Sequence, residues 1–145
     1  MSIQNANIPR SPMLDAAGRP NREWLLYFLS FAGSNYQPTI LPVVNVNTLS
    51  ISPLNFARTQ STVTVSGQLT MVPTVAGVLT QIDIPLPVQS NFNNGYQVSG
   101  TSVVEGAGTA GYITGNVSTH NALLSFTPAS GATQVIDFTF TYQIV

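Results

Sequence analysis

The sequence contains no cysteine and no lysine, and only 6% of its residues are charged. Without cysteine, a chain has no disulfide, no zinc–thiolate site and no thiol nucleophile. A net charge of -1 without clustered basic residues excludes electrostatic binding to nucleic acid or to an anionic membrane surface. Because a typical soluble domain is about 25% charged and near-zero net charge favours association, the composition favours a component of an assembly.

The few charges are concentrated near the N-terminus. Arg10, Asp15, Arg19, Arg22 and Glu23 all precede Trp24, whereas only three acidic residues follow Arg58. This change in composition predicts three regions. They are an N-terminal anchoring arm and helix at 1–33, a linker at 34–59 and a β-sandwich domain at 60–145.

The N-terminal region reads as an extended, proline-containing arm followed by one short α-helix. Asn21 is a good N-cap, and Gly33 follows the expected helix end at Phe31. The apolar residues of this helix cover most of its circumference and include Trp24, Leu25, Phe28, Leu29 and Phe31.

An isolated helix shorter than about 12–15 residues is marginal in water, so this helix needs a partner. The apolar run is also shorter than the roughly 20 residues that span a bilayer, so no membrane insertion is expected. Association with other copies or with another protein would cover the whole helix, and docking on its own β domain is the alternative.

Residues 34–59 are interrupted by three prolines, Pro38, Pro42 and Pro53. Proline cannot donate to a β ladder and is confined to edge strands. This region is therefore expected to be a linker across a surface, with short edge strands at most.

From Gln60 onward the apolar residues recur with a period of two. Val63, Val65, Leu69 and Met71 alternate with polar residues, and the final segment, VIDFTFTYQIV, shows the same pattern. About six such segments lie between turn signals, and no helical pattern separates them. The fold expected is mainly β, an antiparallel β-sandwich or jelly roll preceded by the arm and helix.

Two motifs could indicate chemistry. GAGTAG, residues 106–111, matches the dinucleotide pattern G-x-G-x-x-G, but a strand-like segment follows it where a helix is required. We interpret it as a loop and expect no cofactor. His120, the only histidine, is expected in a turn between strands.

The acidic residues of the β domain are Asp83, Glu105 and Asp137. Asp83 and Asp137 are predicted on outward faces of different strands, and no pattern brings the three carboxylates together. We therefore expect neither a metal site nor a paired-carboxylate hydrolase, and we expect no enzyme activity.

The N-terminal segment SPMLDAAGRPNREWLLYFLSF resembles the attachment peptide of small virion proteins of tailed bacteriophages. The matching positions are Pro12, Asp15, Gly18, Arg19, Pro20, Trp24 and Phe28. The β region, with its closing DFTFTYQIV, is similar to β-sandwich modules of phage tail fibres and head-decoration proteins. The resemblance implies a protein that docks on the virion through its N-terminus and projects the remainder.

The expected function is thus a structural virion component, most simply a tail-associated short fibre or collar protein. The implied partners are other copies of the chain, as a homotrimer, and a tail adaptor, a nozzle or the major capsid protein. The virion, assembled in the bacterial cytoplasm, is the expected location. The expected anchoring residues are Pro12, Asp15, Gly18, Arg19, Pro20, Trp24, Leu25, Phe28, Leu29 and Phe31.

Two alternatives remain open at the level of sequence. A capsid decoration (cement) protein would use a jelly roll to clamp capsid subunits, with the arm reaching a neighbour. A carbohydrate- or receptor-binding β domain would use exposed aromatic side chains beside amide or carboxylate groups, and the candidates are Tyr96, Tyr112 and Asn116.

Overall fold

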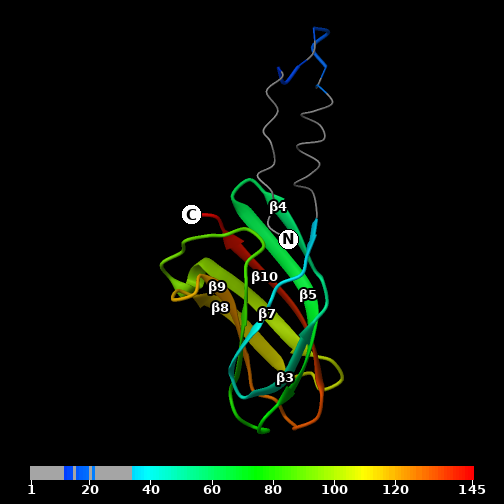
Figure 1. Ribbon diagram of the computed structural model, residues 1–145, viewed down its shortest axis with the longest axis vertical. Helices are drawn as coiled ribbons and strands as arrows, with labels where there is room; N and C mark the ends of the chain where they lie inside the picture. The colour runs from blue at the N-terminus through cyan, green and yellow to red at the C-terminus, as the bar shows by residue number, and fades with distance from the viewer. Residues whose placement is uncertain (1–11, 15, 20, 22–33) are drawn as a thin grey trace.

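A computed structural model of the chain describes residues 12–14, 16–19, 21 and 34–145. Apart from Asn21, the helix expected up to Phe31 lies outside these residues. The described helical structure is one short 3-10 helix, η1 (Gly95–Gln97). We call residues 34–145 the sheet domain. Apart from η1, it consists of strands and their connections (Figure 1).

Ten strands form the sheet domain, and neighbouring strands pair antiparallel throughout the described residues. The strands are β1 (Ser34–Tyr36), β2 (Leu41–Val44), β3 (Val46–Ile51), β4 (Leu54–Thr59), β5 (Thr62–Pro73), β6 (Thr80–Ile84), β7 (Val98–Val104), β8 (Ala110–Asn116), β9 (Asn121–Phe126) and β10 (Gln134–Gln143).

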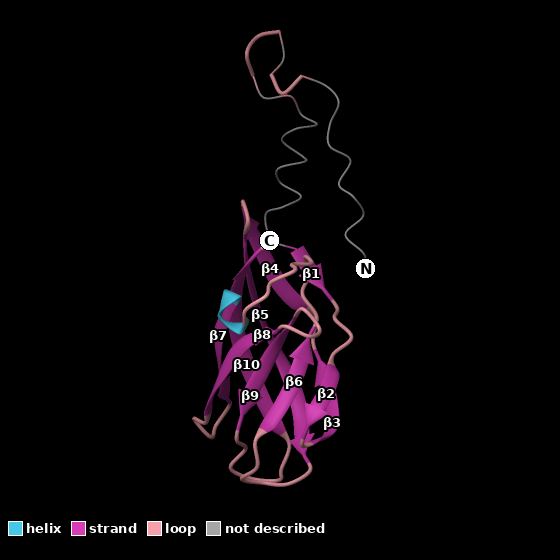
Figure 2. Ribbon diagram, turned by 90° about the vertical axis from the view of Figure 1, so that its left-hand side faces the viewer, coloured by secondary structure: helices cyan, strands magenta, loops and turns pink. Residues whose placement is uncertain are grey.

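The strands make one curled sheet in the order β1-β4-β5-β10-β7-β8-β9-β6-β2, with β3 also paired to β5 (Figure 2). The sheet is curled until its two ends meet at one residue, Asn45. β2 is the last strand of the path and pairs with β6, while β3, which follows directly after Asn45, lies off the path and pairs with β5 near the other end. Asn45 has φ 58°, in the left-handed region that asparagine tolerates better than most residues.

The inward face of the sheet forms the core, as the period-two pattern predicted. Val63, Val65 and Met71 of β5 are fully buried, and so are Ile82 and Ile84 of β6. On β10 the inward aromatic rings form a row, with centroids 6.2 Å apart between Phe138 and Phe140 and between Phe140 and Tyr142. Each such side chain contributes about 1.5–3 kcal/mol by leaving water.

Residues 34–59 are not a linker, which corrects the expectation from sequence. β3 and β4 pair with β5 along its two halves, so the region is part of the sheet. Leu54 of β4 is fully buried, and its side chain fills the space that Gly67 leaves on the inward face of β5. The prolines fit at edges and strand ends, and Pro42 lies on β2, the last strand of the path.

The long connection from β6 to η1 is tied to the end of β10. The Tyr142 hydroxyl donates to the Val88 carbonyl oxygen at 2.8 Å and accepts from the Val88 N–H at 3.1 Å. The Ser90 hydroxyl donates to the Gln143 carbonyl oxygen at 2.7 Å. Phe92, further along this connection, is fully buried.

Candidate functional site

The expected anchoring residues are only partly described. Pro12, Gly18 and Arg19 are exposed, and Gly18 has φ 75°. The Asn21 N–H donates to the Met13 carbonyl oxygen at 2.9 Å, so the segment between them turns back on itself. The other expected anchoring residues, Asp15, Pro20, Trp24, Leu25, Phe28, Leu29 and Phe31, lie outside the described residues.

A group of exposed aliphatic side chains lies where the two ends of the sheet meet. They belong to β2 and to the loop 74–79 between β5 and β6, and each is 41–52% exposed. We call this surface the apolar corner. Its members are Leu41, Val43, Val44, Val75, Val78 and Leu79.

Asn45 holds the two parts of the apolar corner together. Its side-chain nitrogen donates to the carbonyl oxygens of Val75 (2.9 Å) and Val78 (3.1 Å), and its side-chain oxygen accepts from the Val75 N–H at 2.8 Å. The Asn45 carbonyl oxygen also accepts from the Thr74 N–H at 3.2 Å. The loop and the strand are therefore one fixed surface.

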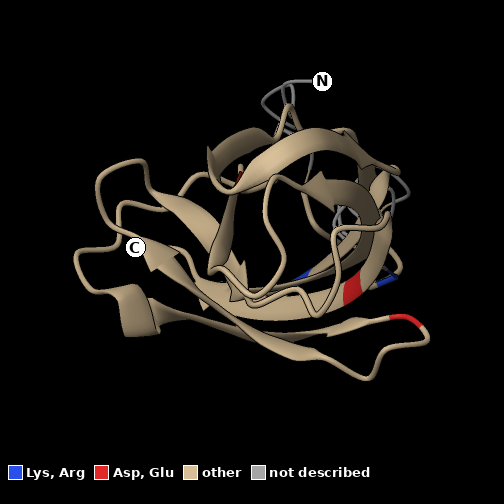
Figure 3. Ribbon diagram, turned by 90° about the horizontal axis from the view of Figure 1, so that it is seen from below, with Lys and Arg blue, Asp and Glu red and all other residues tan. Residues whose placement is uncertain are grey.

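No ionisable side chain belongs to the apolar corner. Between Glu23 and Asp83 the only charged residue is Arg58, which pairs with Val63 near the opposite end of β5. Figure 3 shows how few charged residues the sheet carries. Sequence analysis missed the corner, although an asparagine between the apolar segments LPVV and VNTLSI was a signal for a bend.

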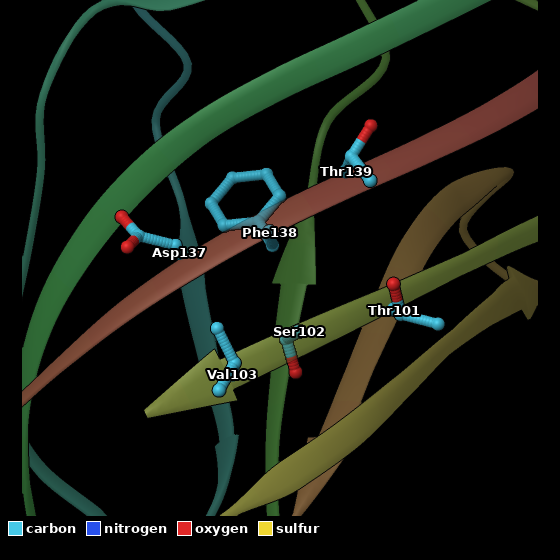
Figure 4. Close-up of a pocket in the computed structure, with 6 residues that line it drawn as sticks. All are labelled: Thr101, Ser102, Val103, Asp137, Phe138 and Thr139. Carbon is cyan, nitrogen blue, oxygen red and sulfur yellow. The ribbon is translucent and has the colours of Figure 1, made fainter. Parts of the chain in front are cut away.

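Glu105 and Asp137 converge, which the sequence did not predict. The side-chain nitrogen of Gln68 donates to both carboxylates, at 3.0 Å in each case. Beside Asp137 lies a shallow depression of about 280 Å³ between β7 and β10, lined by Thr101, Ser102, Val103, Asp137, Phe138 and Thr139 (Figure 4). This arrangement offers hydroxyl and carboxylate groups for hydrogen bonding on an open surface.

An aromatic side chain extends this polar surface. β10 pairs Thr139 with Thr101 of β7, and β7 pairs Thr101 with Tyr112 of β8. Tyr112 is 53% exposed, and Tyr96 in η1 is 79% exposed. Asn116, the third residue singled out for sugar binding, accepts instead from the Ser118 N–H at 3.1 Å and so caps its own turn.

Asp83 is not on a solvated surface, which corrects a second expectation. It is only 2% exposed, and its cross-strand neighbour on β2 is Leu41. The Asn121 side chain donates to Asp83 Oδ2 at 3.4 Å, whereas Oδ1 has no hydrogen-bond partner among the described residues. A carboxylate buried with so few partners lowers stability.

His120 and the glycine motif are in turns, as predicted. His120 has φ 54°, and its Nδ1 lies 3.1 Å from the Phe92 carbonyl oxygen, which fixes the connection before η1 against the β8–β9 turn. Gly106 and Gly108 have φ of 72° and 63° in the turn between β7 and β8. A strand follows this turn, so the helix N-terminus of a dinucleotide site is absent here.

Two buried tyrosines have perturbed acidity. Burial raises the pKa of the Tyr36 and Tyr142 phenols well above the usual range. For Tyr142, the hydrogen bond donated by the Val88 backbone N–H and the Arg58 charge act in the opposite direction. Tyr36 donates to the Pro85 carbonyl oxygen at 3.1 Å. Both hydroxyls hold the β6–η1 connection in place.

Within the described ranges, no group of three or more His, Asp or Glu side chains is arranged to hold a metal ion. The described residues likewise include no helix that is long and apolar enough to cross a bilayer. A search of protein-family models, curated proteins and solved structures finds no match to this chain.

Proposed function

We propose that this chain is a structural component of a tailed-phage virion. Its N-terminal arm and helix attach it to the particle, and the sheet domain projects as a short tail-associated fibre or collar. The partners are other copies of the chain, as a homotrimer, and a tail or capsid protein. In this proposal the curled sheet is an antiparallel sandwich of the jelly-roll type, since one buried cluster joins β5 and β10 to β6 and β9.

The observation that carries the proposal is the apolar, uncharged corner at the end of the domain away from the N-terminal entry. β1 pairs with the first half of β4, where Phe56 lies opposite Val65 of β5. The corner instead adjoins Val46, which pairs with Pro73 of β5. Eight residues of strand separate these levels, a distance of about 26 Å. A monomer gains nothing from a rigid apolar surface in water, but a subunit of an assembly does.

The arm supports the proposal through its sequence. The positions Asp15, Gly18, Arg19 and Pro20 match the attachment peptide, and Gly18 has the left-handed backbone that favours glycine. The charges gathered there contrast with the sparsely charged sheet domain, which carries only Arg58, Asp83, Glu105 and Asp137. This division suits an arm that makes specific polar contacts and a domain that packs against neutral surfaces.

Incorporation into particles tests the proposal. The full chain carrying Arg19→Ala and Trp24→Ala is expected to stay soluble and to be lost from purified virions, as measured by mass spectrometry. Val117→Thr, an exposed substitution in the sheet domain, is the matched control and is expected to be incorporated normally. Equal incorporation of all forms would contradict an anchoring arm, and a copy number near that of the major capsid protein would identify capsid decoration.

One observation favours a second candidate, a glycan-binding surface. Tyr112 is exposed in line with Thr101 and Thr139 beside the depression, and sugars bind through aromatic faces and hydroxyl or carboxylate groups. On a glycan array, Tyr112→Ala would abolish such binding, whereas Tyr96→Ala would leave it intact. A wild-type chain that binds no glycan would eliminate this candidate.

A further inference from the structure

The apolar corner contains six of the exposed large hydrophobic side chains among the described residues. Its six members are drawn from a strand and a loop that are separated by about thirty residues in sequence and that meet only because the sheet ends converge at Asn45. Scattered exposed aliphatic residues are normal on proteins, whereas a contiguous group of this kind marks an interface. The corner therefore needs an occupant.

We propose that the occupant is a second copy of the same chain, packed corner against corner. This twofold contact is additional to the threefold association that the proposed function includes, and it does not depend on a place in a virion. It goes beyond the arm and helix, which the sequence singled out for association.

The absence of charge from the corner favours a second copy of the chain over an arbitrary protein as its occupant. The corner has no ionisable side chain, and its neighbour Asp83 is only 2% exposed. An average protein surface is rich in charged residues, and pressing it onto the corner would remove charges from water without compensation. The corner of another copy carries no such charges, so two corners are complementary to each other.

Symmetry also favours a second copy of the chain as the occupant. An interface between identical subunits around a twofold axis brings one patch against itself, and an apolar patch meets that requirement without matching donors to acceptors. The Asn45 hydrogen bonds hold strand and loop in one arrangement before contact, so little conformational entropy is lost on association.

The extent of the corner fits the centre of such an interface. The largest apolar patch on a typical monomer covers about 300–600 Å², and standard interfaces bury about 800 Å² on each partner. Six half-exposed valine and leucine side chains would supply the apolar centre of such an interface, and exposed polar neighbours such as Thr74 would supply its rim.

Side-chain packing, not strand addition, forms this contact. Pro42 lies in β2 and has no N–H to donate, so β2 is a poor template for another strand. The contact is therefore closed and does not propagate from one copy to the next.

The absence of cysteine from the sequence allows a direct test on the full chain. Val75→Cys places one thiol in the corner, and Val117→Cys places one at a similarly exposed control position. With a short bis-maleimide cross-linker, the Val75→Cys chain is expected to form covalent dimers at least ten times faster than the control. Equal or slower cross-linking at position 75 would overturn the proposal.

Sedimentation velocity over a dilution series provides the second measurement. The Val75→Thr/Val78→Thr chain is expected to have a dissociation constant at least tenfold higher than that of the wild type, while Val117→Thr leaves the constant unchanged. An unchanged constant in the corner variant would assign self-association to the arm and refute the corner contact. Monomeric wild type that co-sediments with phosphatidylcholine vesicles would assign the corner to lipid instead. Absence from virions of a Val75→Cys chain that has an unaltered arm and still cross-links would contradict the virion role alone.

Discussion

The side-chain nitrogen of Asn45 lies 2.8 Å from the hydroxyl oxygen of Thr80, 35 positions further along the chain. Thr80 is fully buried and begins β6, the strand that pairs with β2. One residue thus joins the two ends of the sheet through its backbone and locks the loop between β5 and β6 through its side chain. The apolar corner exists because of this junction.

Asn45→Ala is expected to lower the free energy of unfolding by about 3 kcal/mol. Alanine tolerates the left-handed backbone less well than asparagine does, and each lost side-chain hydrogen bond adds about 0.5–1.5 kcal/mol. Asn45→Gly loses the same hydrogen bonds, but glycine adopts the left-handed backbone without strain. Its loss in free energy of unfolding should therefore be smaller. Urea denaturation measures both, with exposed Asn47→Ala as a control expected within about 0.5 kcal/mol of wild type. Equal losses for the alanine variants at 45 and 47 would show that the junction is not structural.

Gly100→Ala is expected to destabilise the sheet by about 2–4 kcal/mol. A Cβ at this position would run into the carbonyl oxygen of Thr139 and into Phe140 on the neighbouring strand, where neither backbone can move freely. Gly131→Ala is the matched control, because a Cβ there meets nothing within 4 Å. That control should be neutral or more stable by up to about 1 kcal/mol, since alanine reduces the entropy of the unfolded chain. Thermal and urea unfolding measure the stability of both variants. A Gly100→Ala chain as stable as the Gly131→Ala control would contradict the predicted clash.

The alternation of apolar residues was enough to predict six strands of the sheet and the inward residues of β5 and β10, but it wrongly placed Asp83 of β6 on a solvated face. A period of two is a local property, and turn residues separate the strands clearly from β5 to β10. The prolines between residues 38 and 53 concealed the remaining strands. The partners of β2 and β3 lie on β6 and β5, more than ten residues away, and pairing of that kind leaves little trace in a local pattern.

Gly67 shows what the sequence did contain. A glycine in the middle of an otherwise apolar inward face leaves a space, and Leu54 from the supposed linker fills it. The convergence of Glu105 and Asp137 on Gln68 was out of reach, because it depends on the register between β5 and β10. The apolar corner depends likewise on where two distant segments meet.

Asp83→Asn is expected to raise the free energy of unfolding at neutral pH by about 1 kcal/mol or more. The Asp83 carboxylate is buried with one weakly bonded oxygen and one without a partner among the described residues, and a neutral amide of the same shape costs less to bury. Asp137→Asn is the control: Asp137 is half-buried and accepts from Gln68, so its substitution should be neutral or slightly destabilising. Urea denaturation of the two variants compares them directly, and a destabilised Asp83→Asn would show that the carboxylate is needed.

Alkaline pH is expected to unfold the protein through its buried tyrosines. Burial raises the pKa of Tyr36 and Tyr142, so the folded state keeps both phenols protonated at a pH where the unfolded chain ionises them. The stability they contribute is fully present below about pH 10, the ordinary tyrosine pKa. Above that pH it falls by up to about 1.4 kcal/mol per pH unit for each tyrosine.

Two phenylalanine variants test this origin of the alkaline transition. Tyr36→Phe should cost about 1 kcal/mol at neutral pH, because the hydrogen bond to the Pro85 carbonyl oxygen is lost, and should reduce the slope of stability against pH above pH 10 by about half. Exposed Tyr112→Phe should leave that slope unchanged. Urea titrations between about pH 8 and pH 11 measure the slopes. Parallel curves for wild type and Tyr36→Phe would assign the alkaline transition to other groups.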